Sequence, residues 1–313
     1  MSPPKLTPMI KQYLSIKEEY PDAILFYRMG DFYEMFFEDA QVASRVLEIT
    51  LTSRNKKDES PVPMCGVPHR AVSGYIARMI DHGYKVAVCD QIEDPATAKG
   101  LVKRDVVRVI TPGMILDEAF LDKRSNNFVL AVARHGEVFG LSYLDISTGV
   151  FRLVESGDLA AMIDESLRIS PREVLMPESA KTDPAMSTIR EALAERSFTY
   201  LAESAFEHQR CYRRLTEQFK TISLEGFGCE GLPAGVRAAG ALVFYVRETQ
   251  KQKIELFTRL ETYALDQYLL VDDLSCRNLE LEKNIRSGTR RGTLIGIIDH
   301  TKTAMGARLL KLW

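Results

Sequence analysis

Hydrophobic and polar positions divide the first 110 residues into a small α/β unit. The runs AILFY and DFYEMF predict two strands joined at Met29-Gly30, and a helical stripe after Pro8 precedes them. A helix ending near Leu47 and a strand EITLT are expected next. Apolar residues at helical spacing from Val72 predict a helix that stops at Gly83, and YKVAVCDQ and VVRVI follow as strands. Residues 1–115 are therefore expected to form a mixed-sheet domain.

The pattern changes after a Pro-, Gly- and polar-rich stretch, so residues 116–127 are expected to be a linker. Three β segments, FVLAVAR, VFGLSYLDI and VFRLV, predict an antiparallel meander, and the strands EVLM and FTYL then alternate with helices. This order is typical of a ribonuclease-H-like domain, expected over residues 128–252. Residues 253–313 are mostly helical in pattern and end inside an apolar period, which suggests a helical domain that continues further. The fold class is α/β and multidomain.

Composition sets the compartment and limits the partners. The chain of 313 residues is 45% hydrophobic and 27% charged, and its net charge of −2 gives no general attraction to nucleic acid. Its five cysteines are scattered and form no C-x-x-C pair, which suits a reducing cytosol. Neither a signal peptide nor a run of the roughly 18 apolar residues needed for a membrane span is visible. We expect a soluble cytoplasmic protein without membrane contact.

The segment DFYEMF combines aromatic side chains with one carboxylate. In a strand that rises about 3.3 Å per residue, Phe32 and Glu34 share a face about 7 Å apart, and Tyr33 and Met35 share the other. One interpretation is a core face beside a solvated edge charge. The other is a ring that wedges between stacked bases, with a carboxylate that hydrogen-bonds a base edge. The segment alone leaves both interpretations open.

An ordered set of motifs extends beyond this segment. GDFYEMF is followed by PMCGVP, VAVCDQIEDP, VVRVITPG, LDISTG, AAGALVFYVRETQ and RNLELEKN. From about Thr7 to Trp313, this set closely resembles the N-terminal half of the MutS family of DNA mismatch repair proteins. The resemblance implies a mismatch-binding domain, a ribonuclease-H-like connector domain and the start of a helical core or lever domain.

The resemblance also implies roles for particular residues. The family's Phe-x-Glu motif falls on Phe32 and Glu34, so Phe32 would stack on a mispaired or unpaired base and Glu34 would hydrogen-bond it. The implied partners are duplex DNA with mismatches or small loops, a second copy in a homodimer, and MutL, and the implied location is the nucleoid. The chain has no G-x-x-x-x-G-K-[ST] loop, so it is not expected to be an enzyme by itself. No cofactor is expected here, and ATP and Mg²⁺ would belong to the family's C-terminal ATPase domain.

Four cations near the motif are candidates for contacts with the DNA backbone. They are Arg54, Lys56 and Lys57 in the loop SRNKKDES, and Arg70 at the start of the Val72 helix. A solvated loop explains them equally well. Two positions depart from the family pattern, His69-Arg70 after GVP and Met114 after TPG, and both leave the Phe-x-Glu motif intact.

The sequence allows three other interpretations. A metal-dependent nuclease would use Asp145 with Asp164 or Glu165, although a carboxylate that caps the turn of LDISTG explains Asp145 as well. Cys65 and His69 have a ligand-like spacing, but two ligands do not make a zinc site. A protein-interaction module would treat DFYEMF as core. Exposure of Phe32 in the structure distinguishes these alternatives from a base-reading role.

Overall fold

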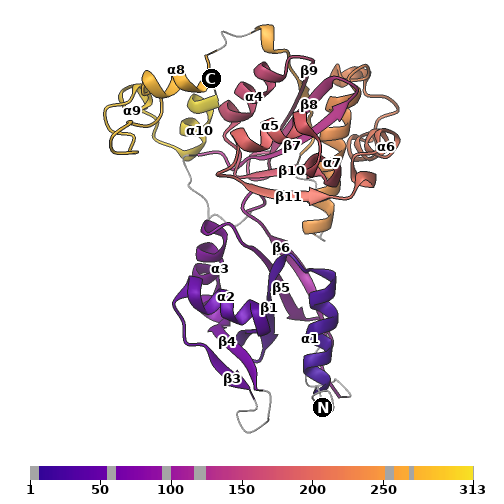
Figure 1. The fold of residues 1–313 in the computed structure, drawn as a ribbon, viewed down its shortest axis with the longest axis vertical. Helices are drawn as coiled ribbons and strands as arrows, with labels where there is room; N and C mark the ends of the chain where they lie inside the picture. Colours follow the sequence, from indigo (N-terminus) through magenta and orange to yellow (C-terminus); the bar gives the residue numbers. More distant parts are fainter. Residues whose placement is uncertain are drawn as a thin grey trace. The chain divides into compact units, whose positions relative to one another are not determined.

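The computed structural model describes residues 7–54, 61–93, 100–115, 125–250, 257–267 and 271–312 (Figure 1). The chain forms two compact units, one built on the residues up to Pro112 and one that begins at Gly113. Most of the expected linker, residues 116–127, lies outside the described residues.

The first unit contains a six-stranded sheet with the strand order β3-β4-β2-β1-β5-β6. β1 pairs in parallel with β5, whereas the other neighbouring strands pair antiparallel. The mixed sheet expected from the sequence is therefore confirmed. Its strands are β1 (Ala23–Met29), β2 (Phe32–Phe36), β3 (Thr52–Arg54), β4 (Val62–Pro68), β5 (Lys85–Gln91) and β6 (Arg104–Ile110).

Three α-helices and a 3-10 turn accompany this sheet: α1 (Pro8–Glu19), α2 (Phe37–Leu47), η1 (His69–Ala71) and α3 (Val72–Asp81). Helix α1 begins as its sequence predicts, because the Thr7 side chain accepts a hydrogen bond from the Ile10 N–H and proline occupies the first turn. Its buried Tyr13 shares a core cluster with Leu25 and Tyr27 of β1. In Figure 1, strands β1, β5 and β6 lie between α1 and the pair α2 and α3.

The strand expected at EITLT is wrong over most of its length. Helix α2 ends at Glu48, which adopts the left-handed conformation (φ 56°) and donates its N–H to the Ser44 carbonyl. The next residues connect the helix to β3, which begins only at Thr52. Helix capping overrides the strand propensity of this short run.

A tight hairpin joins β1 to β2. Met29 pairs with Phe32 across a two-residue connection, and Gly30 has φ 58° whereas Asp31 has no positive φ. Glycine at the first central position with positive φ is the pattern of a type II′ turn, which suits the twist of antiparallel strands. The hairpin thus makes Phe32 the first residue of β2.

The second unit is built on a sheet with the order β11-β10-β7-β8-β9-β12. Strands β7, β8 and β9 form the expected antiparallel meander, and β10 runs parallel to β7 and β11. This is the expected ribonuclease-H-like arrangement, with a short strand added beside β9 that the sequence did not indicate. The strands are β7 (Val129–His135), β8 (Val138–Asp145), β9 (Val150–Ser156), β10 (Glu173–Pro177), β11 (Ser197–Leu201) and β12 (Glu261–Thr262).

Helices cover both faces of this sheet. Val129, Ala131 and Ala133 of β7 belong to one core cluster with residues of α6 (His208–Phe219) and α7 (Pro233–Thr249). The alternate residues Leu130 and Val132, on the opposite face of β7, belong to a second core cluster. That cluster includes residues of α4 (Leu159–Ile169) and α5 (Pro184–Ala192). Burial on both faces explains why the β7 sequence is an almost uninterrupted apolar run.

Helix α7 begins against the sheet. The Glu155 carboxylate on β9 accepts the backbone N–H groups of Ala234 at 2.7 Å and Gly235 at 2.9 Å. Gly140 on β8 lies so close that a Cβ atom there would overlap the backbone of Ala234 and Gly235. A carboxylate from another element therefore satisfies the first N–H groups of this helix.

Beyond β12, the described chain continues in short helices, α8 (Asp273–Asn278), α9 (Leu294–Ile298) and α10 (Ala304–Leu312), in agreement with the helical pattern. The remaining 3-10 turns are η2 (Glu178–Lys181), η3 (Glu203–Ala205), η4 (Glu225–Phe227) and η5 (Leu265–Gln267). Within the ranges that the structure describes, every helix is too short or too polar to cross a membrane.

Candidate nucleic-acid interface

One face of strand β2 is accessible at its first two residues, Phe32 and Glu34, and becomes buried at Phe36, whereas the opposite face is buried. Phe32 is 47% exposed, and Glu34 on the same face is partly exposed. Tyr33 and Met35 on the opposite face are buried. The alternation expected from the sequence is confirmed, and the interpretation of DFYEMF as core is wrong for Phe32. A large aromatic ring at the end of a sheet hairpin is available for a partner.

Side-chain contacts behind β2 hold the strand in place. The Tyr33 hydroxyl is 3.0 Å from each carboxylate oxygen of Asp90 on β5, to which it donates a hydrogen bond. The Tyr33 ring lies 5.5 Å from the ring of His69, and the Arg28 guanidinium stands 5.5 Å from the Tyr33 ring centroid. Burial raises the pKa of Tyr33, so its hydroxyl remains a donor. Phe32 therefore projects from a well-anchored strand.

Glu34 lies over a glycine and pairs with an arginine two strands away. It faces Gly66 on β4, where a Cβ atom would stand 3.6 Å from the Glu34 Cγ. Beyond β4, the Arg54 Nη1 on β3 is 3.3 Å from the Glu34 Oε2. Burial raises the pKa of Glu34 and the nearby Arg54 opposes that shift, with burial the larger effect. The carboxylate is thus a partly desolvated hydrogen-bonding group beside the Phe32 ring.

The sequence treated Arg54 only as a possible phosphate contact and missed this ion pair. Arg70 lies in η1 and is exposed, in agreement with a cation available to a phosphate. Lys56 and Lys57 lie outside the described residues.

The nuclease alternative lacks support. Asp145 is fully buried, and its Oδ1 accepts hydrogen bonds from the Ser147 N–H at 2.9 Å and the Ser147 hydroxyl at 2.6 Å. Its Oδ2 accepts the Asn127 N–H at 3.2 Å. Glu165 is engaged by Arg168 at 2.6 Å. Asp145 thus caps a turn, as the simpler interpretation required.

Zinc ligation by Cys65 and His69 is not supported either. The Cys65 thiol is buried and contacts the Ala40 carbonyl at 3.4 Å, whereas the His69 ring packs near Tyr33. Burial raises the pKa of Cys65 to about 12, which disfavours the thiolate that a metal would require. Among the described residues, no three His, Cys, Asp or Glu side chains are grouped to hold a metal ion.

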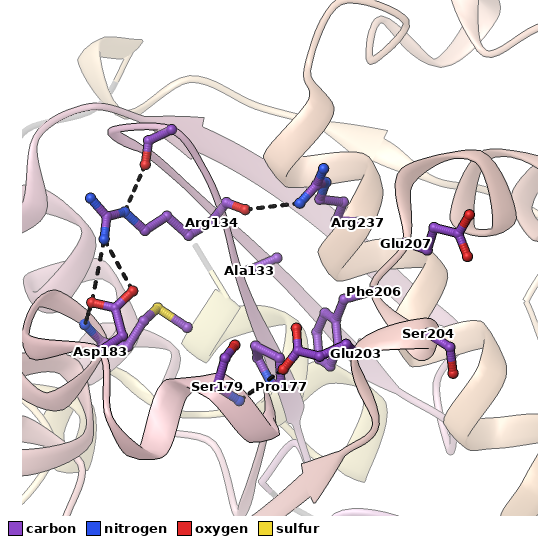
Figure 2. A pocket seen from close by; sticks show the side chains of 12 residues that line it. Ala133, Arg134, Pro177, Ser179, Asp183, Glu203, Ser204, Phe206, Glu207 and Arg237 are labelled. Atoms are coloured by element: carbon purple, nitrogen blue, oxygen red, sulfur yellow. Dashed lines mark hydrogen bonds and ion pairs between the residues drawn. The ribbon is translucent and has the colours of Figure 1, made fainter.

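A pocket of about 690 Å³ lies in the second unit at the carboxyl ends of β7, β10 and β11 (Figure 2). Arg134 pairs there with Asp183 at 3.0 Å, and Glu207 pairs with Arg210 at 2.6 Å. Glu203 accepts a backbone N–H at 2.8 Å. Three carboxylates and two arginines line this pocket, so it has no net positive charge to attract a phosphate backbone. The face of β2 remains the better candidate for nucleic acid.

Comparisons with known proteins cover nearly the whole chain. The family descriptions MutS domain I, MutS domain II and MutS domain III match residues 7–119, 127–258 and 275–313. The chain is 59% identical over 307 residues to the DNA mismatch repair protein MutS of Desulfosudis oleivorans, with 98% of this chain and 35% of that protein covered. It is 54% identical over 318 residues to the protein of that name from Desulforapulum autotrophicum, with 100% and 36% covered. For the protein of that name from Symbiobacterium thermophilum, the identity is 46% over 322 residues, with 100% and 36% covered.

The chain thus spans about a third of the length of these curated relatives. Its two mixed α/β units correspond to the first two family domains, and the short helices after β12 lie in the region matched to the third. With three consecutive domain matches and relatives of this similarity, the chain belongs to the MutS family of DNA mismatch repair proteins.

Proposed function

We propose that this chain is the lesion-reading part of a MutS-family protein, which binds mismatched or unpaired bases in duplex DNA to initiate mismatch repair. Phe32 inserts beside the lesion and stacks on a base, and Glu34 hydrogen-bonds that base. The observation that carries the proposal is the exposure of Phe32 beside Glu34 on a strand whose other face is buried and anchored. Family membership supplies the substrate class.

Recognition would depend on how easily the duplex deforms. A mismatched step unstacks and kinks more readily than a paired step, so inserting a ring costs less free energy at a lesion, with a difference on the order of a few kcal/mol. The charged and polar contacts to the phosphate backbone are independent of sequence. Lesion preference therefore comes from the wedge, and general affinity from cations around it.

The longer protein would act as a homodimer at the nucleoid of the cytoplasm, use ATP and Mg²⁺ in its C-terminal part, and recruit MutL. These statements rest on family membership. The five cysteines are thiols and not disulfides in the structure, a state that the reducing cytoplasm proposed for the longer protein would maintain.

The test is Phe32→Ala in the full-length protein, titrated at fixed salt against matched and single-mismatch duplexes. Stacking of an aromatic ring on a base is worth about 1–3 kcal/mol, so we expect mismatch affinity to fall by roughly fivefold to 150-fold. Binding to matched duplex should persist and remain sensitive to salt.

Leu51→Ala is the matched control, because Leu51 is an apolar residue of the same unit. Its exposed fraction of 46% is close to the 47% of Phe32. It should leave the mismatch preference unchanged. Equal losses on the matched and mismatched duplexes in Phe32→Ala would show that the ring is not a wedge.

A further inference from the structure

The pairing of Glu34 with Arg54 links the base-reading carboxylate to a cation that DNA also attracts. Glu34 projects from β2 and Arg54 from β3, and β4 lies between these two strands. The residue of β4 that pairs with Glu34 is Gly66, which has no side chain between the two charged groups. A Cβ atom at Gly66 would be in ordinary van der Waals contact with the Glu34 Cγ, at 3.6 Å, so Glu34 packs directly against this position of β4. The sheet therefore holds Glu34 in reach of Arg54.

The contact is close enough to neutralise charge and loose enough to exchange. Its length of 3.3 Å exceeds the 2.7–2.9 Å typical of a strong charge-assisted hydrogen bond. The Arg54 side chain is 38% exposed, compared with 20% for Glu34, so solvent and ligands reach the cation more easily than the carboxylate. In the described part of the chain, Glu34 is the only ion-pair partner of Arg54. A phosphate, which binds guanidinium groups well, is a direct competitor for Arg54.

Competition alone does not release the arginine. If Arg54 moved to a phosphate on a matched duplex, Glu34 would be left as a partly desolvated anion without a partner and near other phosphates. At a lesion, a hydrogen bond from the exposed base takes the place of Arg54 at the carboxylate. Only there do both groups have partners after the exchange.

We propose that Arg54 is a specificity-determining residue that stays on Glu34 at matched duplex and transfers to a backbone phosphate when a lesion base engages Glu34. The transfer adds one phosphate contact at mismatched sites only. The hydrogen bond between Glu34 and a lesion base therefore increases the affinity of the protein for the DNA backbone. This inference rests on the proposed role of Glu34 and adds the coupling to Arg54.

One additional phosphate contact has a measurable signature. The slope of log K against log salt concentration should be steeper on mismatched than on matched duplex by about 0.9. The preference for mismatched duplex should then fall by a factor of about 3.5 between 50 and 200 mM salt.

The experiment is a double-mutant cycle in the full-length protein with Arg54→Gln, Glu34→Gln and the double variant, titrated on both duplexes across that salt range. Arg54→Gln alone should lower mismatched-duplex affinity more than matched-duplex affinity, because only the mismatched complex loses a phosphate contact, and it should make the two salt slopes equal. Glu34→Gln should release Arg54 on matched duplex and steepen that slope by about 0.9. Adding Arg54→Gln to Glu34→Gln should reverse this gain.

Arg70→Gln is the matched control, since Arg70 is an exposed arginine of the same unit. Arg70→Gln should change DNA affinity and salt slope by the same amount whether position 34 is Glu or Gln. Equal salt slopes for the unmodified protein on the two duplexes, or equal losses on both duplexes in Arg54→Gln, would overturn the transfer and leave Arg54 an ordinary phosphate contact.

The matched-duplex half of the cycle separates the two proposals. Release of Arg54 by Glu34→Gln does not require a wedge, so it is measurable even if Phe32→Ala shows that Phe32 does not read lesions. Conversely, a mismatch preference that depends on Phe32 but shows no coupling between positions 34 and 54 would preserve the proposed function and refute this inference.

Discussion

The hydrogen bond between Tyr33 and Asp90 should stabilise the strand that carries Phe32. Tyr33→Phe removes the hydroxyl and keeps the ring, so the ring contacts with Phe26 and His69 remain. The change therefore isolates one polar contact behind β2.

The size of the effect follows from the burial of the two partners. A hydrogen bond to a charged group contributes about 1.5–3 kcal/mol. Tyr33 is buried, but Asp90 is only half-buried and its carboxylate can rehydrate after the hydroxyl is lost. We therefore expect an effect at or just below the lower end of that range, about 1–2 kcal/mol of local stability.

Hydrogen exchange measured by mass spectrometry is the suitable assay, because it reports the two units separately. Amides of β1 and β2 should exchange about tenfold faster in Tyr33→Phe, since about 1.4 kcal/mol corresponds to a factor of ten. Peptides from β7 and β8 serve as an internal reference that should not change. Tyr84→Phe, at an exposed tyrosine of the same unit, is the control variant.

A double-mutant cycle with Asp90→Asn checks the assignment. The coupling between the two positions should be about 1 kcal/mol. A coupling below about 0.3 kcal/mol, or unchanged exchange in β2, would refute the view that this hydrogen bond anchors the strand.

Three further predictions concern charge, nucleotide chemistry and pH. Glu34→Gln should tighten binding to matched duplex more than to mismatched duplex, because it removes a charge that phosphates repel; paired equilibrium titrations would contradict this if matched-duplex affinity is unchanged or weaker. The 313-residue chain should hydrolyse no ATP, since it has no phosphate-binding loop, and measurable turnover by pure material would overturn this. It should also bind heteroduplex only weakly at physiological salt, since it offers DNA only the small wedge domain and a few cations, and nanomolar affinity would contradict that. Burial raises the pKa of Tyr27 to about 12, so its contribution to stability is complete below about pH 10, the pKa of an unfolded tyrosine, and is lost as pH rises toward 12. Thermal unfolding between pH 9 and 11.5 should therefore show a smaller loss of stability in Tyr27→Phe than in the unmodified protein, and identical pH profiles would contradict the assignment.

Local patterns predicted the parts of the fold that depend on neighbouring residues. The alternation of Phe32 and Glu34 with Tyr33 and Met35 follows from the two-residue period of a strand, and the structure confirms it. The run EITLT misled the prediction, because the left-handed Glu48 that ends α2 is not evident from strand propensity. Strand β12 has only two residues and no periodicity to detect, although Glu261 pairs with Arg152 at 2.9 Å.

In the candidate site, too, local features could be predicted from the sequence and contacts between distant residues could not. The sequence places Phe32 and Glu34 on one face, but it does not reveal that Arg54 meets Glu34. That contact depends on the order β3-β4-β2, because Arg54 on β3 reaches Glu34 on β2 across the strand between them. Contacts across several strands require the register of the whole sheet, which no short window contains.

The start of helix α7 has a consequence for the order in which the second unit folds. The carboxylate that accepts the first N–H groups of this helix belongs to Glu155, 79 residues before Ala234 in the chain. During synthesis, β8 and β9 therefore leave the ribosome well before the helix that docks on them. The backbone of Ala234 fits only where Gly140 leaves room, so the completed meander supplies both the acceptor and the surface for the first turn. Formation of α7 and its docking on the sheet are expected to occur as one event late in folding, with the meander as its template.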